Sequence, residues 1–240
     1  MKTAIVTGAS SGIGAFIAKN LIEEGYRVYG FGRHFNDVND MEEFITIELD
    51  LKYTDRLVSE IKKIRKNENI SLLINNAGAG YFALHEELNT DKIHEMVCIN
   101  LEIPMILTQL LLRDIKRNRG TIINISSVTA KKSNPHGCAY GATKAGLSSF
   151  ASSLFDETRK YGVKVVTIHP DMTKTNLYRN ADFDVGDTDD TYLNPKEVAD
   201  AVKWVLNQRE GMVITDITLK PQYHRLSRKS KKDKIKHEYI

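Results

Sequence analysis

The stretch TAIVTGASSGIG, Thr3 to Gly14, decides the fold of this chain. A short apolar run reaches Thr7, a glycine-rich turn follows, and apolar residues then recur at helical spacing. Such a turn brings unpaired backbone N–H groups and the positive end of a helix dipole to one place, where a phosphate can bind. We expect the helix to end at Gly25, and a strand over 27–31 completes a βαβ dinucleotide-binding unit. The glycine spacing is TGxxxGxG rather than the common GxGxxG.

The residues Gly32-Arg33-His34 end this second strand, where NAD-binding folds commonly place an acid that bonds the ribose hydroxyls. No carboxylate stands there to repel a 2′-phosphate, and the planar guanidinium of Arg33 can pair with one. The sequence therefore predicts NADP(H) in preference to NAD(H). The alternative is an ordinary surface arginine in a loop.

Later apolar runs predict the rest of a parallel sheet, with polar residues at the ends of its strands. Asp50-Leu51 follow one run, and Asn75-Asn76-Ala77-Gly78 follow another, where small and amide side chains suit a cofactor wall. Strands are expected over 45–49, 72–74, 121–125, 163–168 and 212–219, and helices over 54–67, 91–115, from Tyr140 to about 161, and 195–207.

Tyr140 and Lys144 lie in GCAYGATKAGLS, residues 137–148, and their i,i+4 spacing puts them on one helix face. A free tyrosine titrates near pH ~10, and a fixed ammonium is expected to lower that pKa toward the working range. The pair resembles a proton-transfer device, although Tyr-x-x-x-Lys also arises by chance on amphipathic helices.

Two other positions carry candidate chemistry. Pro104 cannot bond the carbonyl of Asn100, which leaves that oxygen free for a water or ligand; a simple helix kink is the alternative. Ser126-Ser127 follow the strand 121–125, so a hydroxyl stands at the mouth of the sheet.

The segment after strand 163–168 reads His169-Pro170-Asp171-Met172-Thr173-Lys174-Thr175, and its hydroxyls can cap the nicotinamide end of a cofactor. His136 and His169 are interpreted as structural. Residues 176–194 hold five aspartates and few apolar residues. We expect a mobile lid there, whose aspartates hint at a cationic or polyhydroxy substrate.

Composition indicates a soluble protein of 240 residues, with 41% hydrophobic and 27% charged residues. No apolar run approaches the ~18 residues of a membrane span, and we expect no signal peptide, because the first strand leaves no room for one. Cys98 and Cys138 are expected to be free thiols in a reducing cytoplasm, with Cys138 a small buried thiol. No metal site is predicted.

The formal charge of +3 arises from the C-terminus. Residues 221–240 hold seven Lys or Arg and two acids, a net of +5, which leaves −2 for residues 1–220. We therefore expect one domain over 1–220 and a basic tail over 221–240. The tail could contact nucleic acid or anionic lipid, but without interleaved aromatic residues a solvated terminus is favoured.

Together these motifs resemble the classical short-chain dehydrogenase/reductase family over almost the whole chain. TGASSGIG, Thr7 to Gly14, is similar to the family's cofactor fingerprint, and NNAG, residues 75–78, to its central-strand motif. The resemblance implies a catalytic tetrad of Asn100, Ser127, Tyr140 and Lys144, an adenine contact at Asp50, and a Rossmann-type doubly wound sheet of seven parallel strands. The assigned cofactor residues are Thr7, Gly8, Ser10, Ser11, Gly12, Ile13, Gly14, Arg33, Asp50, Leu51, Asn76, Ala77, Gly78, Tyr140, Lys144, Pro170, Thr173 and Thr175.

Two departures from the family pattern matter. Pro170-Asp171 stands where the family usually has Pro-Gly, and the C-terminal segment lacks the VDGG-like ending common in acyl-carrier-protein reductases. The resemblance further implies a homodimer or homotetramer formed through the long helices that precede and contain Tyr140.

The expected function is hydride transfer between NADP(H) and a small carbonyl or secondary alcohol. An epimerase or dehydratase is a second enzyme class, but those resemble an extended branch with a GxxGxxG turn and a longer substrate domain. A non-enzymatic alternative is a cofactor sensor or a nucleic-acid-binding protein that uses the basic tail.

Overall fold

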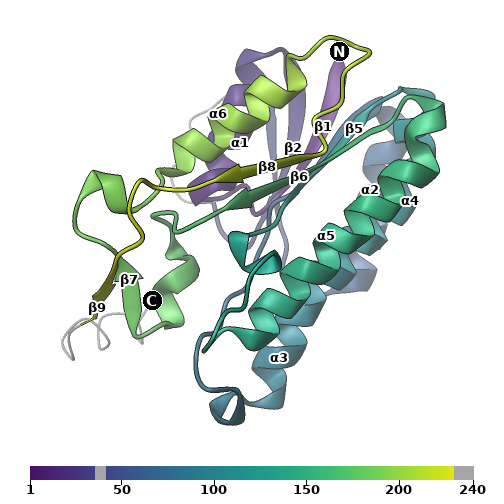
Figure 1. Cartoon of the computed structure of the whole chain (residues 1–240). Helices are drawn as coiled ribbons and strands as arrows, with labels where there is room; N and C mark the ends of the chain where they lie inside the picture. Colours follow the sequence, from purple (N-terminus) through teal and green to yellow (C-terminus); the bar gives the residue numbers. More distant parts are fainter. Residues whose placement is uncertain (36–41, 230–240) are drawn as a thin grey trace.

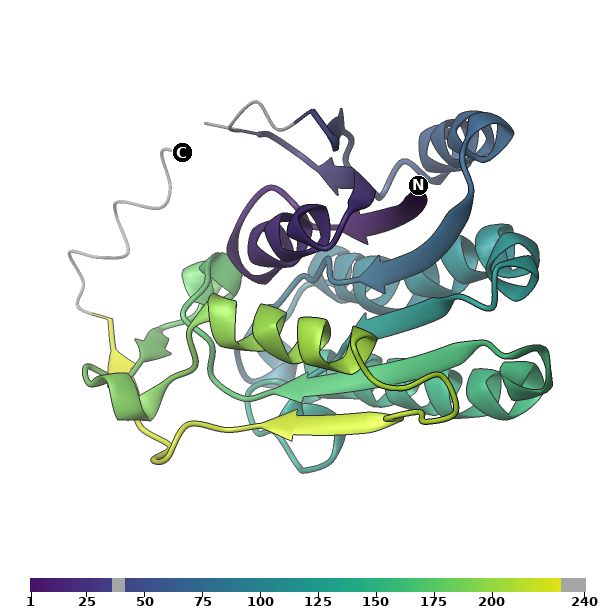
Figure 2. The ribbon, with the colours of Figure 1, turned by 90° about the horizontal axis from the view of Figure 1, so that it is seen from above.

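Seven parallel strands form the central sheet, in the order β3-β2-β1-β4-β5-β6-β8. The computed structural model describes residues 1–35 and 42–229. Figure 1 shows helices on both faces of the sheet, and Figure 2 shows the strands side by side from the purple N-terminal edge to the yellow C-terminal edge. The prediction of a doubly wound Rossmann-type sheet is confirmed.

The strands are short and almost wholly apolar where helices cover them on both sides, as parallel sheets require. Their bounds are β1 Lys2–Thr7, β2 Tyr26–Gly32, β3 Phe44–Glu48, β4 Ile70–Asn75, β5 Thr121–Ile125, β6 Lys164–Pro170 and β8 Asp216–Leu219. The expected last strand began too early, at Met212, because residues 212–214 carry apolar side chains but lie before the residues that pair with β6. The strand order reverses between β1 and β4, which opens a crevice at their carboxyl ends.

Helices α1 (Gly12–Glu23) and α6 (Pro195–Leu206) cover one face and pack on each other. On the other face lie α2 (Thr54–Asn67), α3 (Thr90–Val97), α4 (Ile103–Arg117) and α5 (Cys138–Thr158). Each layer has its own buried core, built from Ile17, Leu21 and Val198 on the first face and from Leu57, Leu107 and Leu154 on the second. The carboxyl ends of the strands are thus left as the accessible edge.

The expected helix over 91–115 is three elements, because a π-helical turn, Cys98–Glu102, lies between α3 and α4. Pro104 stands in the first turn of α4, so its missing N–H lies where the hydrogen bonding changes from the π-helical to the α-helical pattern.

The run Thr90–Arg117 is long and apolar enough to cross a membrane by length and composition, contrary to the sequence expectation. Half of its apolar window is buried inside the protein, as in a core helix.

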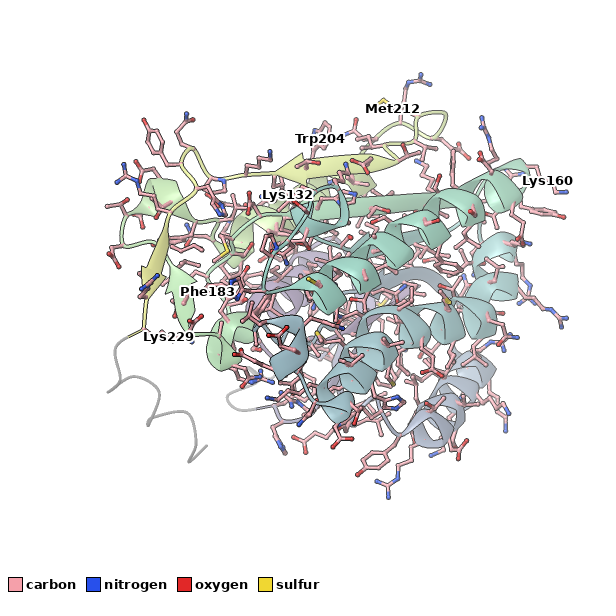
Figure 3. All side chains as sticks on the ribbon, turned by 60° about the horizontal axis from the view of Figure 1, so that its bottom comes forward. Lys132, Lys160, Phe183, Trp204, Met212 and Lys229 are labelled. Atoms are coloured by element: carbon pink, nitrogen blue, oxygen red, sulfur yellow. The ribbon has the colours of Figure 1, made fainter. Side chains whose placement is uncertain are left out.

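Part of the expected tail is ordered. Strand β9 (Leu226–Arg228) pairs antiparallel with β7 (Phe183–Val185), so residues beyond 221 hold the segment expected to be a lid. Figure 3 shows the labelled Phe183 and Lys229 on this same small lobe. Residues 230–240 of the tail lie outside the described residues, and the division at residue 220 stays a prediction.

The two cysteines differ in exposure. Cys98 is buried, whereas Cys138 at the start of α5 is exposed, so the expectation of a buried thiol there is wrong. Its position before the first full helical turn, after the solvent-facing residues 131–136, explains the exposure.

Candidate active site

The glycine turn between β1 and α1 is shaped for a group that approaches the backbone closely. Gly8 and Gly12 have positive φ angles of 65° and 54°, which side chains rarely adopt. A Cβ on Gly14 would lie 2.1 Å from the Gly8 carbonyl oxygen. The first turn of α1 has no acid, and its N-cap Ser11 makes no side-chain cap bond, so its N–H groups remain available to an anion. The turn fits a dinucleotide pyrophosphate.

Thr7 holds this turn against the end of the neighbouring strand β4. Its Oγ1 accepts hydrogen bonds from the backbone N–H groups of Asn76 and Ala77, both at 3.0 Å. The Asn76 amide in turn donates to the carbonyls of Thr7 and Gly8, at 2.9 and 3.1 Å. Hydrogen bonds therefore join the carboxyl ends of β1 and β4, which form the floor of the crevice.

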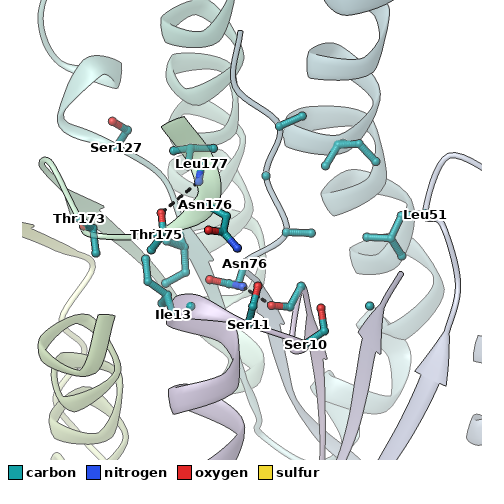
Figure 4. Close-up of a pocket in the computed structure, with 18 of the residues that line it drawn as sticks. Ser10, Ser11, Ile13, Leu51, Asn76, Ser127, Thr173, Thr175, Asn176 and Leu177 are labelled. Carbon is teal, nitrogen blue, oxygen red and sulfur yellow. Dashed lines mark hydrogen bonds between the residues drawn. The ribbon is translucent and has the colours of Figure 1, made fainter. Parts of the chain in front are cut away.

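A cavity of about 240 Å³ opens at the carboxyl edge of the sheet above this floor (Figure 4). Three predicted site residues, Thr7, Gly14 and Asn100, lie outside its lining and support it from behind. All the others line it: Gly8, Ser10, Ser11, Gly12, Ile13, Arg33, Asp50, Leu51, Asn76, Ala77, Gly78, Ser127, Tyr140, Lys144, Pro170, Thr173 and Thr175. The fold thus brings the glycine turn and the catalytic candidates to one cavity.

The two serines after β5 have different surroundings. Ser126 Oγ lies 3.1 Å from the Lys144 carbonyl oxygen and 3.0 Å from Ser148 Oγ, so it is engaged with α5. Ser127 Oγ accepts from the Thr129 backbone at 3.2 Å, and a hydrogen bond from Ser127 reaches the Tyr140 phenol. The structure therefore places Ser127, and not Ser126, beside the tyrosine.

Burial dominates the electrostatics of Tyr140 and Lys144. It raises the pKa of Tyr140 to about 12, with the Ser127 hydrogen bond opposing the shift, and it lowers the pKa of Lys144 to about 8. The Lys144 ammonium donates to the Ile125 carbonyl at 2.9 Å and lies 5.8 Å from the centre of the Tyr140 ring. The expected lowering of the tyrosine pKa by the lysine is therefore wrong for this structure, because the ammonium bonds a carbonyl instead of the phenol.

Asn100 is fully buried in the π-helical turn, with its side chain facing the loop after β4. Its Oδ1 accepts from the Ala79 N–H at 2.8 Å, and its Nδ2 donates to the Ala79 carbonyl at 2.9 Å and to Thr143 Oγ1 at 3.0 Å. The side chain is fully used in fixing this loop against α5. The role of its backbone carbonyl in a proton relay, which rests on the missing N–H of Pro104, stays a prediction.

Arg33 follows β2 and lines the cavity, and so does Asp50, which follows the neighbouring strand β3. Glu48 is a nearby carboxylate that the sequence analysis did not weigh. It is exposed, accepts from the Phe35 N–H at 3.1 Å and does not line the cavity. The guanidinium of Arg33 is thus the charged group that β2 brings to the cavity.

An aromatic cluster beside Tyr140 was not found from the sequence. The Phe82 ring lies 5.3 Å from the Tyr140 ring, 5.8 Å from Tyr178 and 5.4 Å from Phe183, measured between centroids. Burial raises the pKa of Tyr178, the cluster member that lines the cavity. The rings come from segments a hundred residues apart, so no local pattern revealed them.

The aspartates of residues 176–194 do not line this cavity, so they give no support to a cationic or polyhydroxy substrate. Of the acids in the preceding loop, Asp171 lines it. Its carboxylate accepts from the Met172 N–H at 2.9 Å, a bond that a glycine could not make. With aspartate instead of glycine after Pro170, the proline still lines the cavity, and the Asp171 carboxylate adds a hydrogen bond with the Met172 N–H.

Comparisons with known proteins agree on one family. The family model described as short chain dehydrogenase matches residues 2–185. An uncharacterised oxidoreductase of Staphylococcus epidermidis is 29% identical over 227 residues, 92% of this chain and 97% of the relative. A 3-oxoacyl-acyl-carrier-protein reductase of Buchnera aphidicola is 33% identical over 186 residues, 75% of this chain and 76% of the relative. The solved structure of an alcohol dehydrogenase from Thermococcus sibiricus, complexed with 5-hydroxy-NADP, matches with a TM-score of 0.82 at 25% identity, over 94% and 98% of the two chains.

Proposed function

The chain belongs to the short-chain dehydrogenase family, and from this premise we propose that it is an NADP(H)-dependent oxidoreductase acting between carbonyl and secondary alcohol groups. One observation carries the proposal: Ser127, Tyr140 and Lys144 line the same cavity as the glycine turn and Arg33. A sensor would have no use for an acid–base pair at the reacting end of its cofactor site.

The residues present fit a dinucleotide. The N–H groups at the start of α1 would hold the pyrophosphate, Asp50 the adenine, and Arg33 a 2′-phosphate. Solved structures of this fold hold NADP in some cases and NADH in others, so the preference rests on Arg33 of this chain. When bound, the nicotinamide supplies or takes up the hydride.

The residues of this chain then bind the substrate oxygen and transfer the proton. Ser127 hydrogen-bonds the substrate oxygen, where negative charge develops, and Tyr140 gives its proton to that oxygen or removes it in the reverse direction. The Lys144 ammonium lies within the same buried site. A movement of the ammonium toward the Tyr140 phenol would stabilise the ionised phenol. The Asn100 carbonyl, which Pro104 cannot bond, offers a place for a water that resupplies the proton.

Tyr178 lines the cavity, and the Phe82 ring packs against it; this aromatic surface favours a substrate with apolar surface next to its carbonyl group. The similarity to an acyl-carrier-protein reductase does not bring that substrate with it, because the VDGG-like ending is absent.

Titration with NADPH and NADH, followed by nicotinamide fluorescence, tests the cofactor assignment. We expect tighter binding of NADPH in wild type, loss of that preference in Arg33→Ala, and preference for NADH in Arg33→Asp. An unchanged NADPH:NADH ratio in Arg33→Ala would overturn the role of Arg33. Turnover with a panel of ketones and aldehydes should fall at least about 100-fold in Tyr140→Phe while NADPH still binds.

The non-enzymatic alternative makes a different prediction. A nucleic-acid-binding protein would be retained on nucleic acid in a salt-dependent way, and deletion of residues 221–240 would abolish this retention. We propose that the protein shows neither effect, and that it acts in the cytoplasm as a homodimer or homotetramer. Light scattering on the purified chain measures the assembly.

A further inference from the structure

His169, the last residue before Pro170 in β6, has no part in the chemistry above and yet is fully buried behind the catalytic serine. Its Nδ1 lies 3.1 Å from the Ser127 carbonyl oxygen, and its Nε2 lies 2.7 Å from an Asp216 carboxylate oxygen on β8. Asp216 is also bonded by Lys131, which follows Ser127 by four residues. A chain of polar contacts therefore runs from the surface to the serine backbone.

Both neighbours of the imidazole ring can only accept hydrogen bonds, which restricts its protonation state. A carbonyl oxygen has no proton to give, and the Asp216 carboxylate stays ionised because Lys131 and His169 outweigh the burial that would raise its pKa. A neutral ring carries one N–H and can satisfy one of the two acceptors. Only the imidazolium donates to Ser127 and to Asp216 together.

The carbonyl at the other side of this turn is held in the same manner. Ile125 O accepts from the Lys144 ammonium at 2.9 Å, and the Ser126 N–H donates to Ile168 O at 2.7 Å. Ser127 Oγ is further fixed by the Thr129 N–H. Ser127 O also accepts from the Ala130 N–H at 3.1 Å, so the bond from His169 is a second contact on the serine carbonyl, supplied by a side chain from the neighbouring strand.

We propose that His169 is a positioning residue, whose doubly protonated ring, oriented by Asp216, holds the backbone of Ser127 in place for the substrate oxygen. Of the ionisable groups nearby, Asp216 on β8 bonds the ring, Lys131 after β5 bonds Asp216, and Lys144 on α5 bonds the Ile125 carbonyl two residues before Ser127. With a single proton on the ring, the shorter bond to the charged Asp216 is kept and the Ser127 carbonyl faces a lone pair. The serine carbonyl is then held by the Ala130 N–H alone, one contact instead of two.

Asp216→Asn separates this idea from a general structural role. The asparagine amide can donate to Nε2, so a neutral ring keeps its proton on Nδ1 and continues to hold Ser127. His169→Asn places an amide N–H where Nδ1 stands and removes the titration altogether. Both variants should therefore keep the bond from residue 169 to the Ser127 carbonyl at the pH at which wild type loses it. His169→Leu should lack this bond at every pH.

The first measurement needs neither substrate nor cofactor. In the full-length protein, ¹⁵N spectra follow the two His169 ring nitrogens and the Ser127 and Thr129 amides from pH 5 to 9. We expect the two amides to move along the ring's titration curve in wild type and to stay still in His169→Asn. Amides that ignore the ring in wild type, or that move equally in His169→Asn, would overturn the proposal.

The second measurement uses turnover and rests on the proposed function. Loss of the serine turn should lower kcat about tenfold at high pH in wild type and at all pH values in His169→Leu, with little change in KM for NADPH. His169→Asn should keep the low-pH kcat up to pH 9. If no carbonyl is turned over but the amides follow the ring, the reductase assignment fails and the positioning role stands.

Discussion

Replacement of Lys144 by Met should make the protein more stable while it removes turnover. The ammonium is 3% exposed, and the Ile125 carbonyl is the hydrogen-bond acceptor that the structure gives it. Burial lowers its pKa from 10.5 to about 8, so at pH 7 the buried charge costs about 3 kcal/mol of unfolding free energy. Loss of its hydrogen bond offsets about 1–2 kcal/mol, so Lys144→Met should gain about 1–2 kcal/mol at pH 7.

The pH dependence of this difference is the sharper test. Between pH 8 and 10.5 the unfolded chain binds more protons at Lys144 than the folded chain, so wild-type stability rises with pH in this window. The stability of Lys144→Met relative to wild type should therefore fall by about 2.5 kcal/mol between pH 7 and 10, from a gain of about 1–2 kcal/mol to a loss of about 0.5–1.5 kcal/mol, measured by urea unfolding. Lys62→Met, at an exposed position of α2, controls for the substitution itself. A difference that stays constant with pH, or a variant several kcal/mol less stable at pH 7, would refute the reasoning.

Three further variants test the floor and the wall of the cavity. Gly14→Ala puts a methyl group against the Gly8 carbonyl and should lose about 2–3 kcal/mol of unfolding free energy together with NADPH binding. Unchanged stability would contradict this close approach. Thr7→Val leaves two N–H groups unpaired and should cost about 2–3 kcal/mol in urea unfolding; Thr7→Ser, which keeps the oxygen, should cost less than half of that. Deletion of residues 221–240 removes β9 and the bond from Lys229 to the Tyr178 carbonyl, so limited proteolysis should cut residues 176–191 faster. A chain that ends at Lys229 should resist cleavage like the full-length protein. Equal cleavage rates for all three chains would contradict the idea that β9 holds residues 176–191.

The parts of the fold that sequence alone predicts are those encoded by local patterns. The helix 54–67 and the strand 121–125 were predicted with their observed bounds, because apolar spacing and turn residues mark both ends of each. The π-helical turn around Asn100 was missed, since a π turn keeps the helical periodicity and differs only in its hydrogen bonds. Strand β9 was missed for another reason: its partner β7 lies forty residues earlier, and neither strand is long enough to show alternation.

The candidate site divides in the same way. The glycine turn, Ser127, Tyr140 and Lys144 carry recognisable spacings, and the structure gathers them in one cavity. The sign of the tyrosine pKa shift could not be read from the i,i+4 spacing, because it depends on burial and on which acceptor the ammonium meets. His169 was interpreted as structural from the sequence, and only the tertiary structure shows that it contacts the serine.

These electrostatics decide how an alkaline loss of activity would be interpreted. Burial raises the pKa of Tyr140 to about 12, so ionisation of the phenol cannot account for a fall in kcat that begins below pH 10. Two candidates remain at the serine turn: Lys144, whose pKa burial lowers to about 8, and the proposed contact of His169 with the Ser127 carbonyl. Each holds a carbonyl beside Ser126, at Ile125 and at Ser127. A fall that His169→Asn abolishes belongs to the histidine, and one that persists in this variant belongs to the lysine.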